Sequence, residues 1–153
     1  MMFKKILWPT DFSKSSFKAL DAAVELAEQF KAELHVVNVV NEIPLVYGTA
    51  AAGGIEIPTY QKQLEEENQA ELDKLVKANI GKKVRTRTHL KTGREIDRIV
   101  ETADENDVDL IVIATHGHTG LKRMFIGSVA EGVVRRASQA VLTIRITEED
   151  EAG

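Results

Sequence analysis

Three glycines and one serine are the residues whose types and spacing point most directly to chemistry. Gly117, Gly120 and Gly127 fall within residues 114–134, ATHGHTGLKRMFIGSVAEGVV, in a chain with only ten glycines. Ser128 follows directly, where a helical pattern begins. Glycine lets a ligand approach the backbone, and the first amides of a helix lack intrahelical partners, so this combination can hold a phosphate. The alternative is an ordinary strand-to-helix loop in which Ser128 only caps the helix.

A helix N-terminus alone is too weak to bind a nucleotide. It contributes roughly 0.3–1 kcal/mol per charge, whereas micromolar affinity requires about 8 kcal/mol. We therefore expect a nucleotide site to combine several amide hydrogen bonds, a base pocket and a divalent cation. The sequence contains neither G-x-x-x-x-G-K-[ST] nor a G-x-G-x-x-G after the first strand pattern, so it lacks the common phosphate signatures.

The elements that must position these residues alternate between strand and helix patterns. Strands are predicted at 6–8, 34–40, 84–90, 108–114 and 140–146, and helical spacing connects the apolar residues of 17–27, 64–76, 96–103 and 129–137. This alternation predicts an open, five-stranded parallel sheet with helices on both faces. The period-two pattern of 84–90 favours an edge strand. We predict the order 3-2-1-4-5, with the topological switch between the first and fourth strands.

The predicted switch brings two segments together. Ligands of such sheets bind outside the carboxyl ends of the strands at this point. Pro9, Thr10 and Asp11 follow the first strand, and the glycine stretch follows the fourth. Asp11 also fits a turn or helix-capping role, with Ser13 as the expected N-cap of the first helix.

Composition limits the class of protein. The 153 residues are 43% hydrophobic and 29% charged, with a net charge of −4, as in a globular domain without a nucleic-acid footprint. No cysteine is present, and no signal peptide or membrane-spanning apolar run is evident, so we predict a cytoplasmic protein without membrane insertion. Residues 1–146 form one predicted domain, with an irregular excursion at 42–58 and an acidic tail at 147–153 that is expected to fray.

Two long stretches resemble the universal stress protein family, KKILWPTDFSKSSFKAL and IVIATHGHTGLKRMFIGSVAEGVVRRASQAVLTIR. The resemblance covers nearly the full length and implies a Rossmann-like fold of the adenine nucleotide alpha hydrolase type. Nucleotide-binding members carry G-x2-G-x9-G-[ST]. Gly117, nine further residues and then Gly127-Ser128 match its second half, whereas Ala114 occupies the first glycine position.

The resemblance implies a site for ATP, ADP or AMP, accompanied by Mg²⁺. Asp11 would face the ribose or adenine, and Val39 would contact the base through its backbone, although core packing also explains a valine there. The full predicted set is Pro9, Thr10, Asp11, Val39, Ala114, His116, Gly117, Gly127, Ser128, Val129 and Ala130. His116 and His118 also raise the alternative of a metal site, but no third ligand has suitable spacing, so we favour solvent-exposed or phosphate-proximal histidines.

The last predicted strand, 140–146, is more apolar than is usual for an edge strand, and it contains neither proline nor lysine. Such an edge invites pairing, and the resemblance implies a homodimer through it. The alternative is coverage by the chain's own tail, which has no large apolar side chain to pack.

The sequence therefore favours an ATP-binding regulatory protein that changes conformation or its affinity for an unknown protein partner. One alternative is a slow ATP hydrolase or phosphotransfer enzyme, but no nucleophile–base pair is visible. The other is a dimeric interaction module that does not bind nucleotide, an alternative that Ala114 keeps open.

Overall fold

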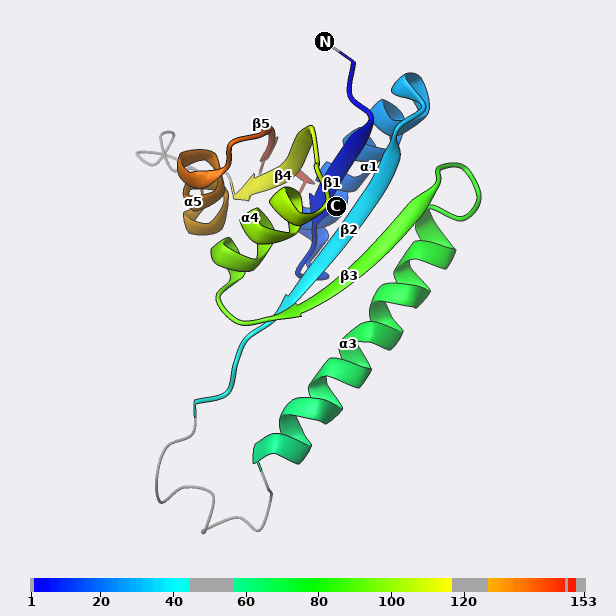
Figure 1. Cartoon of the computed structure of the whole chain (residues 1–153). Helices are drawn as coiled ribbons and strands as arrows, with labels where there is room; N and C mark the ends of the chain where they lie inside the picture. Colours follow the sequence, from blue (N-terminus) through cyan, green and yellow to red (C-terminus); the bar gives the residue numbers. More distant parts are fainter. Residues whose placement is uncertain (1, 45–56, 117–126, 148, 151–153) are drawn as a thin grey trace.

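The computed structural model describes residues 2–44, 57–116, 127–147 and 149–150. They form one parallel sheet between two layers of helices (Figure 1). The elements in chain order are β1 (Lys5–Pro9), α1 (Lys14–Phe30), β2 (Glu33–Val40), α3 (Ile57–Asn79), β3 (Thr86–Thr92), α4 (Glu95–Glu105), β4 (Leu110–His116), α5 (Ser128–Arg136) and β5 (Ala140–Ile146).

The strand order is β3-β2-β1-β4-β5, with every pairing parallel, which confirms the predicted fold class and order. The direction of winding reverses between β1 and β4, so the topological switch lies there. β1 is central because Ile6, Leu7 and Trp8 are fully buried and need apolar cover on both faces. Ser13 is the N-cap of α1, as predicted, since its side chain accepts a hydrogen bond from the Ser16 amide.

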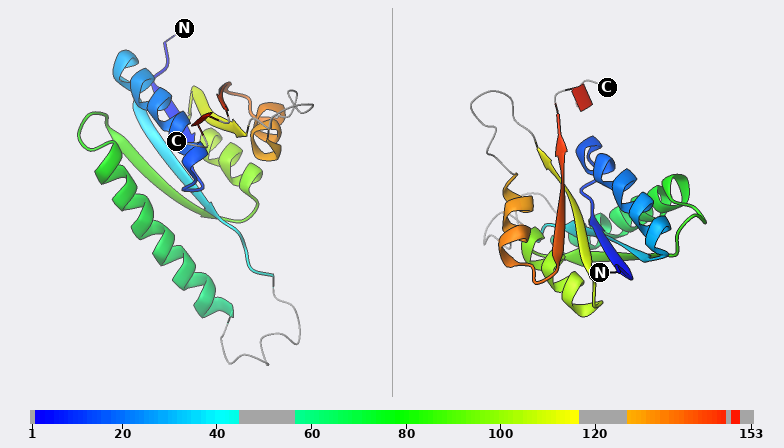
Figure 2. Two further views of the ribbon diagram at one scale, coloured as in Figure 1. Left: turned by 180° about the vertical axis from the view of Figure 1, so that it is seen from behind. Right: turned by 90° about the horizontal axis from the view of Figure 1, so that it is seen from above.

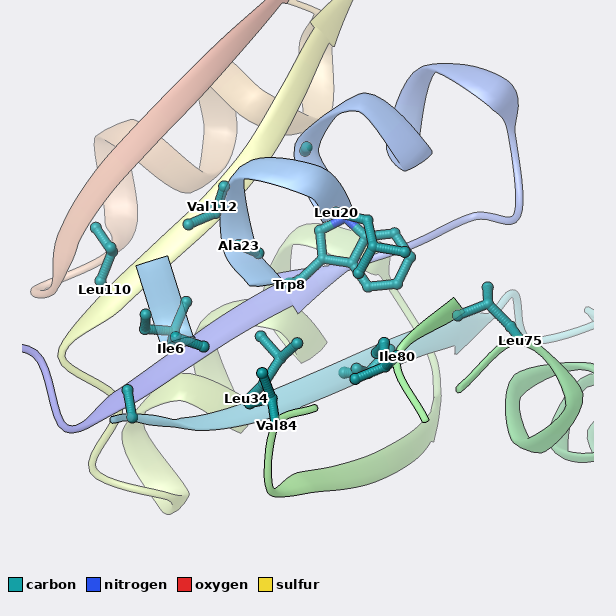
Figure 3. Close-up of a cluster of buried hydrophobic side chains, with 14 of the residues drawn as sticks. Ile6, Trp8, Leu20, Ala23, Leu34, Leu75, Ile80, Val84, Leu110 and Val112 are labelled. Atoms are coloured by element: carbon teal, nitrogen blue, oxygen red, sulfur yellow. The ribbon is translucent and has the colours of Figure 1, made fainter. Parts of the chain in front are cut away.

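Successive side chains of β1 enter two different cores because strand side chains alternate between faces. Ile6 and Trp8 pack with α1 and α3 on one face (Figure 3). Leu7 packs on the other face with residues of α4 and α5. Figure 2 shows α1 and α5 on opposite sides of the sheet. Both cores hold the switch point of the sheet in place.

The structure corrects the predicted boundaries at several points. α3 begins at Ile57, so the last two residues of the predicted irregular excursion are helical, while 45–56 lie outside the described residues. β3 begins two residues later than predicted, at Thr86. Within the predicted tail, Asp150 accepts hydrogen bonds from Thr147 and pairs with Lys18 at 3.2 Å.

No helix in the described part of the chain is long and apolar enough to cross a membrane. The longest, α3, has 23 residues, and charged side chains occupy much of it.

Candidate functional site

The loop between β1 and α1 is held by short-range hydrogen bonds. The Thr10 hydroxyl accepts from the Phe12 amide (3.0 Å) and shares a 2.9 Å hydrogen bond with Ser16 Oγ. Asp11 Oδ1 accepts from the Ser13 amide at 2.9 Å, which closes an Asx turn. Phe12 adopts the left-handed region, with φ of 65°, at the sharpest point of the turn. The loop therefore has a defined backbone while Asp11 stays exposed.

The N-terminus of α5 lies across the switch from this loop. Gly127 is the N-cap and the helix starts at Ser128, with no side chain capping it. The first intrahelical bond of this end runs from the Glu131 amide to the Gly127 carbonyl (2.9 Å). By helix geometry, the amides of Ser128, Val129 and Ala130 have no intrahelical acceptor. The φ of Gly127 is −49°, so this glycine does not serve a positive-φ turn.

One pocket of about 220 Å³ separates the two segments. Eight of the predicted site residues line it, namely Pro9, Thr10, Asp11, Ala114, Gly127, Ser128, Val129 and Ala130. They come from β1 and its loop, from the end of β4 and from the start of α5. The topology thus brings together residues more than a hundred positions apart in the sequence.

The remaining three predicted site residues are Val39, His116 and Gly117. Val39 is half-buried among the side chains beneath α4 and is not among the lining residues, which fits the alternative of core packing. His116 is the last residue of β4. Gly117 lies outside the described residues, as do Gly120 and His118.

The lining also contains residues that sequence reasoning missed. The other described lining residues are Ser13, Ser15, Ser16, Glu95, Ile99 and Ile113. Glu95 belongs to the first turn of α4. The sheet topology could have identified Glu95, because every loop that follows a parallel strand emerges at the same edge of the sheet. The start of α4 therefore belonged with the other two segments.

The charge of the pocket is negative on the described side. Asp11 and Glu95 are its charged lining residues, and no basic side chain is among those described. Burial, together with the Asp11 carboxylate, raises the pKa of Glu95. The α5 amides at the opposite wall supply positive partial charge. The pocket thus offers carboxylates to hydroxyl or amine donors at one side and amides to an anion at the other.

No group of three histidine, cysteine, aspartate or glutamate side chains in the described ranges could hold a metal ion. The general-base candidates among the described lining residues are the carboxylates of Asp11 and Glu95, and neither histidine nor lysine is among those residues.

A doubly wound parallel sheet with a pocket at its switch point places the chain among the Rossmann-like α/β proteins. A sequence model of the universal stress protein family matches residues 2–145, and the chain belongs to that family.

The similarity to individual members extends over the whole domain. A universal stress protein of Methanocaldococcus jannaschii is 38% identical over 144 residues, covering 94% of this chain and 83% of the relative. The solved structure of the M. jannaschii protein MJ0577 superposes with a TM-score of 0.77 at 25% identity, covering 96% of this chain and 99% of the other.

Two further solved structures share the fold at lower identity. A universal stress protein in complex with cAMP has a TM-score of 0.62 at 24% identity, covering 96% of this chain and all of the other. The Archaeoglobus fulgidus universal stress protein in complex with dAMP has a TM-score of 0.55 at 20% identity, covering 94% and 99%.

Proposed function

We propose that this protein is a cytoplasmic regulatory protein that binds an adenine nucleotide in the pocket between the β1–α1 loop and α5. One observation carries the proposal: the uncapped amides of α5 face the carboxylate-bearing loop of β1 across a single pocket. A nucleotide has the matching polarity, because its phosphates suit helix amides and its ribose and base offer hydrogen-bond donors. The cAMP and dAMP held by two proteins of the same fold support this class of ligand.

The individual contacts follow from this orientation. The amides of Ser128, Val129 and Ala130 would receive a phosphate, with the Ser128 hydroxyl beside them. Asp11 has a second carboxylate oxygen beyond the one that closes its turn, and this oxygen would accept from the ribose or adenine. Ala114 also lines the pocket, so a bound ligand would lie beside its methyl group.

The test begins with the purified full-length chain. Nucleotide released by denaturation is identified by chromatography, and AMP, ADP and ATP are titrated by calorimetry with and without Mg²⁺. We expect an adenine nucleotide with affinity in the micromolar range. If none is released and none binds, the proposal fails and the protein is better described as an interaction module.

Two matched serines locate the phosphate site. Ser128 and Ser138 are both exposed, but only Ser128 lines the pocket. Ser128→Ala should weaken AMP binding by roughly 10- to 150-fold, the range expected for one hydrogen bond to a charged group, while Ser138→Ala should leave it unchanged. Equal affinities in the two variants would place the phosphate elsewhere.

We also propose that β5 forms a homodimer interface. β5 is an edge strand whose one described strand partner is β4. Leu142 is 37% exposed, and Ala140 and Thr143 are exposed beside it. An apolar edge with unpaired backbone groups is suited to pairing with a second copy.

A further inference from the structure

One face of α3 changes from apolar to polar along its length. In the C-terminal half, Leu72 and Leu75 are buried in the core that α3 shares with α1. The same face carries Gln61, Glu65 and Asn68 in the N-terminal half, at spacings of four and three residues. Figure 1 shows this half of the helix extending past the carboxyl ends of β2 and β3.

Three hydrogen bonds attach this polar face to the carboxyl edge of the sheet. Gln61 Oε1 accepts from the Ile43 amide at 3.0 Å. Glu65 Oε1 accepts from the Thr92 hydroxyl at 2.8 Å. Asn68 Nδ2 donates to Asn38 Oδ1 at 3.0 Å. The bonds of Gln61 and Glu65 are only partly buried and can exchange with water at small net cost, whereas the Asn68 bond reaches the buried Asn38 side chain and is costly to break.

The Asn68 contact continues to the pocket. Asn38 is only 3% exposed, and its Nδ2 donates to the Thr10 carbonyl oxygen at 2.9 Å. Because a carbonyl can only accept, this bond fixes which end of the Asn38 amide faces Thr10. The oxygen end then faces α3 and requires the donor that Asn68 supplies. The direction of both hydrogen bonds is therefore determined.

Thr10 connects the hydrogen bonds of Asn68 and Asn38 to the pocket. Its amide donates to the Val37 carbonyl (2.9 Å), and its hydroxyl pairs with Ser16. Asp11 follows directly, so a displacement of the Thr10 carbonyl moves the carboxylate that lines the pocket. If the buried Asn38 amide lost a hydrogen-bond partner, the free-energy cost of the unpaired group would favour a displacement of the Thr10 carbonyl.

We propose that Asn38 and Asn68 are positioning residues of the nucleotide pocket and couple its occupancy to the N-terminal half of α3. This inference rests on the proposed function and names its regulation. A ligand that fixes residues 10–13 favours the Asn38 orientation that accepts from Asn68, and hence one placement of the helix. By thermodynamic linkage, the factor by which the nucleotide changes the affinity of this half of α3 for a partner protein equals the factor by which that partner changes the affinity for the nucleotide.

The experiment replaces the donor of Asn68 in the full-length chain. Asn68→Asp presents a second acceptor to Asn38 Oδ1, so the Asn38 amide must turn and leave the Thr10 carbonyl without a donor. Asn68→Ala only removes the bond. The matched controls are Gln69→Asp and Gln69→Ala, because Gln69 is the adjacent α3 residue and its side-chain amide donates to Asp73 on the same helix.

We expect Asn68→Asp to weaken AMP binding by at least about fivefold, Asn68→Ala by less, and the Gln69 variants to leave it unchanged. Hydrogen exchange should show that AMP protects residues 57–68 in the wild type and no longer does so in Asn68→Asp. Equal AMP affinity and equal protection in the Asn68 and Gln69 variants would overturn the coupling while leaving the proposed function intact.

Measurements without ligand separate the two proposals. If Asn38 and Asn68 position the β1–α1 loop, Asn68→Asp accelerates hydrogen exchange of the Phe12 and Ser13 amides relative to Gln69→Asp, whether or not AMP binds. A wild type that binds no adenine nucleotide overturns the proposed function and, with it, the regulatory role. Unchanged amide exchange at Phe12 and Ser13 overturns the positioning role of Asn38 and Asn68.

Discussion

The carboxylates of Asp11 and Glu95 line one pocket from two different elements, the β1–α1 loop and the first turn of α4. No basic side chain lies among the described lining residues to compensate them. Burial and the neighbouring Asp11 raise the pKa of Glu95, because both disfavour its ionised form. An anionic ligand entering this pocket adds a further negative charge. Its binding is therefore linked to the protonation of Glu95.

Nucleotide affinity should increase as pH falls through the raised pKa of Glu95. The ligand's charge raises that pKa further, so the complex holds more protons than the free protein and lower pH favours the complex. Glu95→Gln should bind AMP more tightly than the wild type at pH 7, and this advantage should diminish toward pH 5. Calorimetry at each pH gives the ratio of the AMP affinities of Glu95→Gln and the wild type. Protonation of AMP itself affects both proteins and therefore cancels in this ratio.

Glu101→Gln is the control on the same helix, since Glu101 pairs with Arg98 and is not among the residues that line the pocket. A Glu95→Gln to wild-type affinity ratio that stays constant from pH 7 to pH 5 would show that Glu95 is not linked to binding.

Mg²⁺ should strengthen ATP binding more than AMP binding. The described wall contributes two carboxylates, so each additional phosphate charge is costly unless a cation accompanies it. Phosphate oxygens are ligands that Mg²⁺ prefers, and ATP presents more of them than AMP does. Titrations of both nucleotides in Mg²⁺ and in EDTA measure the difference. An identical Mg²⁺ effect on ATP and AMP would contradict this account of the pocket's charge.

Much of the site was predictable because it follows from topology. β1 and β4 are recognisable as central strands from their apolar sequence, and the switch between them places Asp11 near Ser128. Glu95 was missed because a carboxylate in the first turn of an amphipathic helix is common on sequence grounds alone. Only the three-dimensional arrangement shows that it faces the pocket.

The polar contacts between elements were not predictable. Asn68 lies on what the sequence presents as a core face of α3, but it bonds the buried Asn38 amide. His89 follows Arg85 and Arg87 in the period-two pattern of 84–90, yet it is half-buried against His35. Both contacts depend on register across strands and on helix placement, which periodicity does not determine.

The His35–His89 pair should make the fold sensitive to acid. His35 Nδ1 and His89 Nε2 lie 2.9 Å apart in nearly parallel rings, and His35 Nε2 is buried without a partner among the described residues. Burial, followed by the charge of His89, lowers the pKa of His35 from 6.5 to about 4. The other charges that act on the pair belong to Lys5, Glu33, Arg87, Lys91 and Glu105.

As pH falls from 6.5 toward 4, the unfolded chain gains a proton that folded His35 does not accept. Each pH unit in this window therefore lowers the free energy of unfolding by about 1.4 kcal/mol, or up to about 3 kcal/mol in total. The lowered pKa of His89 acts in the same direction. Urea unfolding at pH 7 and pH 4.5 measures the loss. His35→Gln should be less stable at pH 7 but lose less on acidification; parallel losses in both proteins would exclude the pair as the cause.

Leu142→Pro should convert a dimer to a monomer or cause aggregation. Leu142 lies in the middle of β5, and proline there removes a backbone donor and cannot be accommodated within a paired strand. Light scattering coupled to size-exclusion chromatography measures the mass of the wild type and the variant. Tyr60→Lys is the control, because Tyr60 is an exposed apolar residue of α3, far from β5 in sequence and on a different element. It should keep the wild-type mass. A dimer that persists in Leu142→Pro, or a wild type that is monomeric at micromolar concentration, would place the interface elsewhere or remove it.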